Sequence, residues 1–254
     1  MGFSLNYHVG PLNGPREPRY KVSQVLSNKQ VPHAIWFEDA LVYYGVPTAV
    51  FDLYILVEDI DLASNTLATA GWTFDMQGPH RIGNAEVDLE VFPQQRLISP
   101  DNQTRTVLLP AADWKFPLTL DTPLQHPTVK NDPSQRVPLP PLPGLLDALI
   151  ECWLDCPSDD SMLLLGLACQ IFYLYTYVPA LKEKSFAEKM KYENRQFHLD
   201  VLMGMKAGTV RFRNHQRAIR DALRQGQYEL QECSVSSDSE YFFSFPGGVN
   251  GQPI

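Results

Sequence analysis

The first half of the chain switches between helix-like and strand-like hydrophobic patterns. In WFEDALVYYG, apolar side chains recur at the spacing of one helix face and Gly45 follows, so a short helix is predicted. The next run, AVFDLYILV, alternates with a period of two and is rich in aromatic and β-branched residues, which predicts a strand. DLASNTLATAGW predicts a second helix that ends at Gly71. With AEVDLEVF and RTVLLPAADWKF as further strands, residues 31–116 are expected to form an α/β layer with a mixed sheet.

The second half has no strand pattern. Residues 117–143 hold eight prolines in 27 positions, which predicts an extended linker or a segment that wraps across the surface. A helical bundle is expected over residues 144–228, with helices at 145–154, 162–178, 185–205 and 211–224. Residues 1–30 are predicted to be a loosely ordered lead-in. Residues 229–254 are predicted to be a flexible tail whose aromatic YFFSF stretch docks onto the body.

One apolar segment is long enough to be considered as a membrane-spanning helix. MLLLGLACQIFYLYTYV has 17 residues and no charge, which is the lower limit for a membrane-spanning helix. It contains Gln170 in its middle and three tyrosines near one end, and the chain has no second segment of this kind. We therefore expect a buried helix of a helical domain and no membrane association.

The amino-acid composition limits which partners and which cellular compartment are expected. With 254 residues and 44% hydrophobic content, the chain can bury a sizeable core. A net charge of -8 argues against a nucleic-acid partner. The four cysteines form no disulfide framework, and Cys152 and Cys156 lack a second Cys/His pair for zinc. Free thiols and the absence of a secretory pattern in MGFSLNYHVG favour a cytoplasmic protein.

Three stretches carry a family resemblance: WFEDALVYYGVPTAVFDLYILV, VLLPAADW and ENRQFHLD. An α/β module with a helix, a turn and an acid-bearing strand, followed by helices, resembles the nucleotidyltransferase fold. The likeness is to its AbiEii-type and minimal nucleotidyltransferase groups, and to a set of uncharacterised fungal proteins related to that fold. The resemblance extends over residues 31–225, with its motifs concentrated in 36–58.

The resemblance implies a particular chemistry. In that family a turn of small residues opens a helix whose N–H groups hold nucleotide phosphates. Two carboxylates two residues apart on the next strand, joined by a third on a neighbouring strand, bind divalent metal. The two metal ions then stabilise in-line phosphoryl transfer. The implied cofactor is Mg²⁺ or Mn²⁺, and the implied ligand is a nucleotide or another small molecule.

Carried over position by position, the family motif is only partly present. The small-residue pair falls on Phe37 and Glu38, and the second carboxylate falls on Tyr54. The first carboxylate falls on Asp52, and the third on Asp88. The resemblance therefore implies a degenerate metal and phosphate site in which Asp52 and Asp88 remain as metal or catalytic residues.

The acidic residues expected near this site each allow two interpretations. Asp88 with Glu86 and Glu90 forms either the solvated face of a strand or a group that meets Asp52 across the sheet. Glu38 is either a helix-start acid or a replacement carboxylate near Asp52.

The later helices carry two further polar groups. Arg195 and His198 either belong to a solvated helix face or line a cleft between the two halves, where His198 acts as an acid/base group. The arginines of residues 211–224 form either a charged outer face or a phosphate-binding surface.

Three functions remain open on these grounds. The first is binding of a nucleotide or other small ligand in the cleft, with weak or no nucleotidyl transfer. The second is a repurposed enzyme that modifies a small metabolite with cleft carboxylates as acid and base. The third is a non-catalytic protein-interaction module. No Walker loop, G-x-G-x-x-G, G-x-S-x-G or H-E-x-x-H motif occurs in the sequence.

Overall fold

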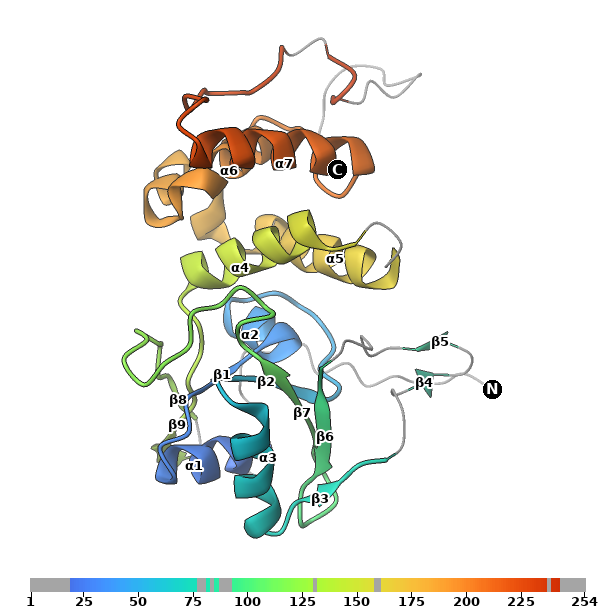
Figure 1. The fold of residues 1–254 in the computed structure, drawn as a ribbon, viewed down its shortest axis with the longest axis vertical. Helices are drawn as coiled ribbons and strands as arrows, with labels where there is room; N and C mark the ends of the chain where they lie inside the picture. Colours follow the sequence, from blue (N-terminus) through green and yellow to red (C-terminus); the bar gives the residue numbers. More distant parts are fainter. Residues whose placement is uncertain are drawn as a thin grey trace.

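The fold combines a mixed α/β layer with a C-terminal helical region (Figure 1). The structure is a computed structural model, and it describes residues 19–76, 81–82, 85–86, 93–129, 132–157, 161–236 and 239–242. The α/β layer lies at one end of the long axis and the helices of the second half lie at the other. This arrangement agrees with the expected order of an α/β part followed by a helical part.

The central sheet has five strands in the order β1-β2-β7-β6-β3. Strand β2 pairs in parallel with β7 and antiparallel with β1, while β6 is antiparallel to both β7 and β3. The sheet is therefore mixed, as the sequence predicted. Its strands are β1 (His33–Ile35), β2 (Leu53–Val57), β7 (Arg105–Pro110), β6 (Gln95–Ile98) and β3 (Thr73–Phe74).

Two predicted helices of the α/β layer are present. Helix α2 (Phe37–Tyr43) joins β1 to β2, and α3 (Ile60–Thr69) follows β2. The Asp59 carboxylate accepts hydrogen bonds from the backbone N–H groups of Asp61 (3.0 Å) and Leu62 (2.9 Å), which caps the start of α3. Gly45 and Gly71 follow the helices with φ of 93° and 98°, a conformation that glycine adopts without strain.

The expectation of a loosely ordered lead-in was wrong for residues 21–28. These residues form helix α1 (Lys21–Asn28), which contacts α3 and β1. Val22 and Leu26 are one helical turn apart and both are buried in the core. Burial of this face fixes the helix.

Two short hairpins complete the strands. Strands β4 (Arg81–Ile82) and β5 (Ala85–Glu86) pair with each other, as do β8 (Thr128–Val129) and β9 (Asp132–Arg136). The strand predicted for AEVDLEVF is seen at its first two residues, and residues 87–92 lie outside the described part of the chain.

The proline-rich segment wraps along the edge of the sheet. The Ile35 N–H donates to the Pro138 carbonyl over 2.8 Å, and the Tyr44 hydroxyl donates to the Pro140 carbonyl over 2.6 Å. Val137 and Leu139 are buried. Because β1 is an edge strand with unpaired backbone groups, this segment covers an edge that would otherwise be exposed.

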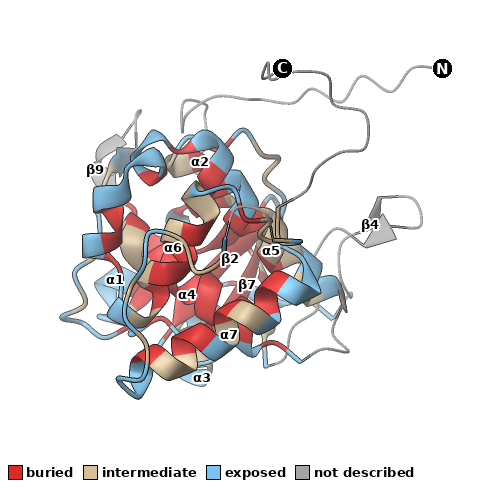
Figure 2. Cartoon of the chain, turned by 90° about the horizontal axis from the view of Figure 1, so that it is seen from above, coloured by how far each residue is buried: buried red, intermediate tan, exposed pale blue. Residues whose placement is uncertain are grey.

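The helical region contains α4 (Leu142–Asp155), α5 (Ser161–Tyr177), α6 (Arg195–Leu202) and α7 (Val210–Arg224). Helices α4 and α5 lie next to the α/β layer, and α6 and α7 form the outer layer (Figure 1). Buried positions concentrate where α4, β2 and β7 overlap in the view along the long axis (Figure 2). No helix in the described part of the chain has the length and apolar content that crossing a membrane requires.

A continuous helix over residues 185–205 was a wrong prediction. After the 3₁₀ turn η1 (Pro179–Lys182), the chain instead forms two further 3₁₀ turns, η2 (Lys184–Lys189) and η3 (Tyr192–Asn194), before α6 begins. Met190 and Lys191 have extended backbone (ψ 161° and 139°). The buried Asp147 carboxylate accepts a hydrogen bond from the Lys191 N–H over 2.9 Å. That donor is thus unavailable for a continuous helix.

The aromatic stretch near the C-terminus docks as expected where the structure describes it. Tyr241 and Phe242 pack against the hydrophobic core. The Tyr241 ring lies 4.9 Å from the ring of His215 on α7, measured between centroids. Residues 243–245 of the stretch lie outside the described residues.

Candidate functional site

Asp52 lies in a buried cluster of charged side chains at the start of β2. Its carboxylate accepts a hydrogen bond from Arg96 Nη1 over 3.2 Å, and Arg105 Nε is 4.0 Å away. Arg96 lies opposite Val107, and Val107 lies opposite Tyr54, so these side chains share one face of the sheet. Asp52, two residues before Tyr54, projects from the same face. The Asp52 side chain is 3% exposed, and the Arg96 side chain is 8% exposed.

Arg19 ties helix α2 to the start of β2. Its guanidinium binds both carboxylate oxygens of Asp39 (3.0 and 2.7 Å). It also donates to the backbone carbonyls of Phe51 (2.9 Å) and Asp52 (3.0 Å). Burial by itself would lower the pKa of Arg19. The neighbouring Asp39 and Glu38 carboxylates favour the charged guanidinium, and the pKa lies above its usual value. Glu38 is half-buried and contributes to the same electrostatic cluster.

Three guanidiniums of this cluster contact three carboxylates. Arg105 donates to the Asp75 carboxylate from Nε and Nη2, both over 2.8 Å. The guanidiniums of Arg19, Arg96 and Arg105 thus contact the carboxylates of Asp39, Asp52 and Asp75. A divalent cation needs carboxylate oxygens that are available to it. The Asp52 carboxylate instead faces two guanidiniums, which repel a cation. The residues described at this position do not fit Mg²⁺ or Mn²⁺.

Aromatic rings fill the space where the resemblance implies phosphate. Phe37 begins α2 and is 1% exposed. Its ring centroid lies 5.0 Å from that of Tyr54 and 4.7 Å from that of Trp114, both in edge-to-face geometry. Phe37 also has a φ of 51°, a left-handed conformation that is an outlier for a bulky residue. The Tyr54 ring is thus buried under Phe37 and belongs to the core.

The carboxylates expected from the next strand cannot be compared with Asp52. Asp88 and Glu90 lie outside the described residues, and Glu86 is described only as the backbone partner of Arg81. Strand β2 pairs with β1 and β7, and the residue of β7 next to this site is Arg105. Among the residues that the structure describes, no group of three His, Cys, Asp or Glu side chains could hold a metal ion.

His198 and Arg195 lie in the outer helical layer and have structural partners there. His198 Nδ1 is 2.9 Å from the Tyr175 hydroxyl, and its Nε2 is 3.2 Å from the Glu183 carbonyl. Burial lowers the pKa of His198. Arg195 donates to the carbonyls of Met190 and Glu188, both over 3.3 Å. Helix α6 is separated from β2 by the α4 and α5 layer (Figure 1), so the structure does not bring these residues together with Asp52.

A cavity of about 210 Å³ lies between the two halves of the fold. Strands β2 and β7 end together, because the Ala111 N–H donates to the Val57 carbonyl over 2.8 Å. The turn after β7 then forms one wall of the cavity, as expected for ligand sites at the carboxyl ends of parallel strands. The lining residues are Pro93, Asp113, Trp114 and Lys115 from the α/β side, and Cys152, Asp155, Cys156, Pro157, Leu163 and Leu167 from the helical side.

The cavity has an apolar interior and a charged rim. Trp114 is 5% exposed, whereas Asp113 and Lys115 are exposed. Within the described part of the chain neither of these two charged side chains has an ion-pair partner. Lys115 has a φ of 55°, a second left-handed non-glycine residue. Burial raises the pKa of the Cys152 thiol to about 12, so this thiol is protonated and weakly nucleophilic at neutral pH.

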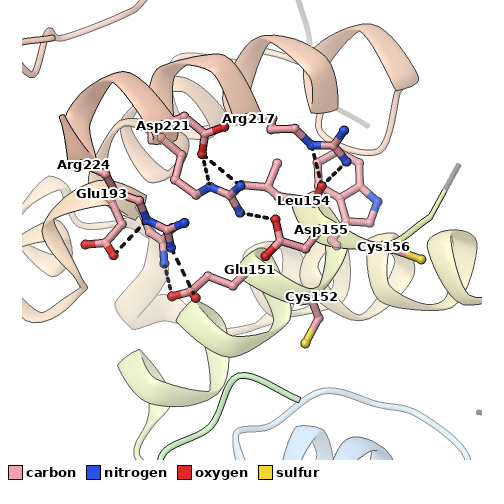
Figure 3. Close-up of polar contacts among 12 residues, drawn as sticks. Glu151, Cys152, Leu154, Asp155, Cys156, Glu193, Arg217, Asp221 and Arg224 are labelled. Atoms are coloured by element: carbon pink, nitrogen blue, oxygen red, sulfur yellow. Dashed lines mark hydrogen bonds and ion pairs between the residues drawn. The ribbon is translucent and has the colours of Figure 1, made fainter. Parts of the chain in front are cut away.

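Arginines of α7 fix the helical wall of the cavity. Arg213 Nε donates to the Trp153 carbonyl and Arg217 Nε donates to the Leu154 carbonyl, both over 2.8 Å. These bonds satisfy carbonyls at the end of α4 that have no partner within the helix. Arg220 pairs with Asp155 over 2.8 Å. Figure 3 shows Arg217 directed at Leu154, and Arg224 between Glu151 and Glu193.

One sequence interpretation is corrected in part by this geometry. Arg213 and Arg220 are buried against α4, whereas Arg211 and Arg224 are exposed, so only some of the α7 arginines belong to the expected charged outer face. The side chains of Cys152 and Cys156 point in different directions in Figure 3. The cavity itself was not predicted, although the AADWK turn after a buried strand was a signal for it.

Comparison with known proteins adds no family assignment. No family model matches the chain, and no curated protein matches it in sequence.

Proposed function

We propose that this chain binds a small organic molecule in the cavity between its α/β part and its helical part. The observation that carries the proposal is the position of the cavity beside the turn that follows β7, with walls from both halves. In this proposal the Asp52 cluster is an ion-pair network that supports the fold.

The size and lining of the cavity define the class of ligand. Its volume of about 210 Å³ lies below the roughly 300–1,000 Å³ of sites for drug-sized ligands, so the ligand is smaller than a nucleoside triphosphate. Trp114, Leu163 and Leu167 supply apolar surface for its body. Asp113 and Lys115 at the rim can orient its polar groups.

Metal-dependent nucleotidyl transfer has less support. The carboxylate of Asp52 faces Arg96 and Arg105, and the ring of Phe37 fills the start of α2. A transferase of the resembled family needs an accessible carboxylate pair and an open phosphate site. The ion pairs and aromatic rings at these positions favour a structural role.

Thermal unfolding tests the proposal with a panel of small aromatic, carboxylic acid and amine compounds. A compound present at 100 times its dissociation constant stabilises the folded state by about 2.7 kcal/mol, which shifts Tm by a few degrees. Leu163→Trp fills the cavity from α5 and should abolish the shift. Leu62→Trp is the matched control, because Leu62 lies on α3 and is 51% exposed.

The same measurement distinguishes the competing function. Each nucleoside triphosphate is added with Mg²⁺ or Mn²⁺, to wild type and to Asp52→Asn. A shift that requires both metal and triphosphate and is lost in Asp52→Asn would establish nucleotide binding at Asp52 instead. A compound shift that persists in Leu163→Trp would show that the cavity is not the binding site.

A further inference from the structure

Two charged side chains of the cavity lining have no partner among the described residues. Asp113 and Lys115 both line the cavity, and in the described part of the chain neither side chain has a hydrogen bond or an ion pair. The third charged residue of the lining, Asp155, is compensated by Arg220, with 2.8 Å between Oδ1 and Nη1. The lining therefore offers a bound molecule one carboxylate and one ammonium group.

Both charged residues belong to a turn that packing holds in place. The Lys115 and Phe116 N–H groups each donate to a backbone carbonyl of the turn over 3.2 Å. Trp114, which lies between the two charged residues, packs edge-to-face against Phe37 with 4.7 Å between ring centroids. The backbone at Asp113 and Lys115 is thus fixed before a ligand binds, which lowers the entropy cost of binding.

The backbone conformation of Lys115 is not explained by folding alone. Lys115 has a φ of 55°. This left-handed conformation costs an L-residue free energy that glycine does not lose. The Lys115 side chain is exposed, so burial does not compensate that cost. Strained positions of this kind concentrate at ligand sites, which favours a binding role for the ammonium group.

The charge of Lys115 also acts on the opposite wall of the cavity. Burial raises the pKa of the Cys152 thiol on α4, and the charge of Lys115 opposes this rise. Cys152 Sγ lies 3.9 Å from the carbonyl oxygen of Asp113. The turn and α4 thus meet beside both charged groups, and Leu163 and Leu167 of α5 supply the apolar part of the wall.

We infer that the cavity ligand is a small zwitterion with an apolar body, of the class of free amino acids with an aromatic or branched apolar side chain. Lys115 binds its carboxylate, Asp113 binds its ammonium group, and its body lies against Trp114, Leu163 and Leu167. This inference rests on the proposed cavity site and narrows its class of ligand.

Charge separates a zwitterion from molecules with a single charge. A molecule with only a carboxylate or only an ammonium group leaves either Asp113 or Lys115 uncompensated. A zwitterion compensates both. It also has no net charge, so the chain's net charge of -8 does not repel it as it repels an anion.

Two sets of three compounds test the inference. Phenylalanine, 3-phenylpropionate and 2-phenylethylamine share one apolar body and carry both charges, only the carboxylate or only the ammonium group. Leucine, 4-methylpentanoate and 3-methylbutylamine form the second set. In titration calorimetry of the full chain at pH 7, the zwitterion of at least one set should bind about tenfold more tightly than its two relatives.

Variants of the turn assign each charge. Lys115→Gln should weaken binding of the zwitterion and of the carboxylate compound about tenfold, and should not affect the amine. Asp113→Asn should weaken binding of the zwitterion and of the amine, and should not affect the carboxylate compound. Lys29→Gln is the matched control, because Lys29 is exposed at the end of α1.

Lys115→Gly separates binding from folding. Glycine adopts the left-handed φ without strain, so this variant should unfold at a temperature no lower than that of wild type. Its affinity for the zwitterion should nevertheless fall as far as in Lys115→Gln. A lower Tm in Lys115→Gly with unchanged affinity would mean that Lys115 supports the fold instead.

The outcomes distinguish this inference from the proposed cavity site. A compound that binds wild type, fails to bind Leu163→Trp and is unaffected by Lys115→Gln and Asp113→Asn would overturn the zwitterion and leave the cavity site in place. Equal affinities within each set of three compounds would do the same. If no compound of these sets or of the wider panel binds, the cavity site is refuted and the zwitterion with it.

Discussion

The guanidinium of Arg96 lies 3.2 Å from the carboxylate of Asp52, and both side chains are buried on one face of the central sheet. This contact explains a charge in an otherwise apolar run of sequence. A buried carboxylate is tolerated where a buried cation compensates it. The acid that resembles a metal ligand in the sequence is thus one member of an ion-pair network.

Asp52→Asn should destabilise the protein. The substitution removes the charge that compensates Arg96 and Arg105 in a buried setting. Breaking a buried pair by removing one partner costs about 3–5 kcal/mol, so the free energy of unfolding in urea should fall by roughly that amount. Asp121→Asn is the control, because Asp121 is exposed and such changes stay within about 0.5 kcal/mol. Equal stability of Asp52→Asn and wild type would rule out the network role.

Phe37 allows a test of backbone strain. Phe37→Ala and Phe37→Gly both remove a buried ring, at a cost of about 3–5 kcal/mol. The φ of 51° is left-handed, which costs an L-residue about 1–2 kcal/mol and glycine nothing. Phe37→Gly should therefore be more stable than Phe37→Ala by about 1 kcal/mol in urea unfolding, the reverse of the usual order for a helix. Ala40→Gly, in the middle of α2, is the control and should show the usual loss.

Acid should weaken the fold through His33. His33 lies 2.7 Å from the Ser23 hydroxyl and 2.9 Å from the Val31 carbonyl, and burial lowers its pKa to about 4. The unfolded chain binds this proton near pH 6.5 and the folded chain only near pH 4, so stability is lost as pH falls through that window. The full loss is about 3 kcal/mol.

A matched variant isolates this contribution. His33→Gln removes the titrating group, so the stability difference between wild type and His33→Gln should shrink as pH falls from 6.5 to 4. Asp147 titrates in the same range with the opposite sign, because burial raises its pKa to about 6. Both proteins contain Asp147, so its contribution to the free energy of unfolding cancels in the difference between them at each pH. A pH-independent difference would contradict the assignment to His33.

The sequence pattern correctly predicted the elements that depend only on residues close together in the chain. The alternation in AVFDLYILV predicted β2, and the glycines after α2 and α3 adopt the left-handed backbone that ends a helix. The break at Met190 and Lys191 was not predictable, because it depends on Asp147, 44 residues before Lys191. The inward direction of Arg213 and Arg217 also depends on α4 carbonyls distant in sequence.

The candidate site was less predictable than the fold for the same reason. Asp52 was identified from its neighbours, but its partner Arg96 is 44 residues away in the chain. The cavity forms where the turn after β7 meets the ends of α4 and α5. Because the cavity is formed by segments that are distant in sequence, each segment alone carries only a weak sequence signal for it, such as the AADWK turn.

Asp200 should control the attachment of the C-terminal segment. This carboxylate is 0% exposed, and it accepts hydrogen bonds from the Ser234 N–H (2.7 Å) and hydroxyl (2.6 Å) and from Gln196 Nε2 (2.8 Å). Gln216 Nε2 also donates to it.

Asp200→Asn replaces one of two acceptor oxygens by a donor that faces other donors. Because a buried unsatisfied donor costs about 1–3 kcal/mol, hydrogen exchange at Ser234 should accelerate by roughly tenfold or more. Glu229→Gln, at an exposed position of the same segment, should leave the exchange unchanged. Unaltered protection at Ser234 in Asp200→Asn would mean that Tyr241 and Phe242 hold the segment without Asp200.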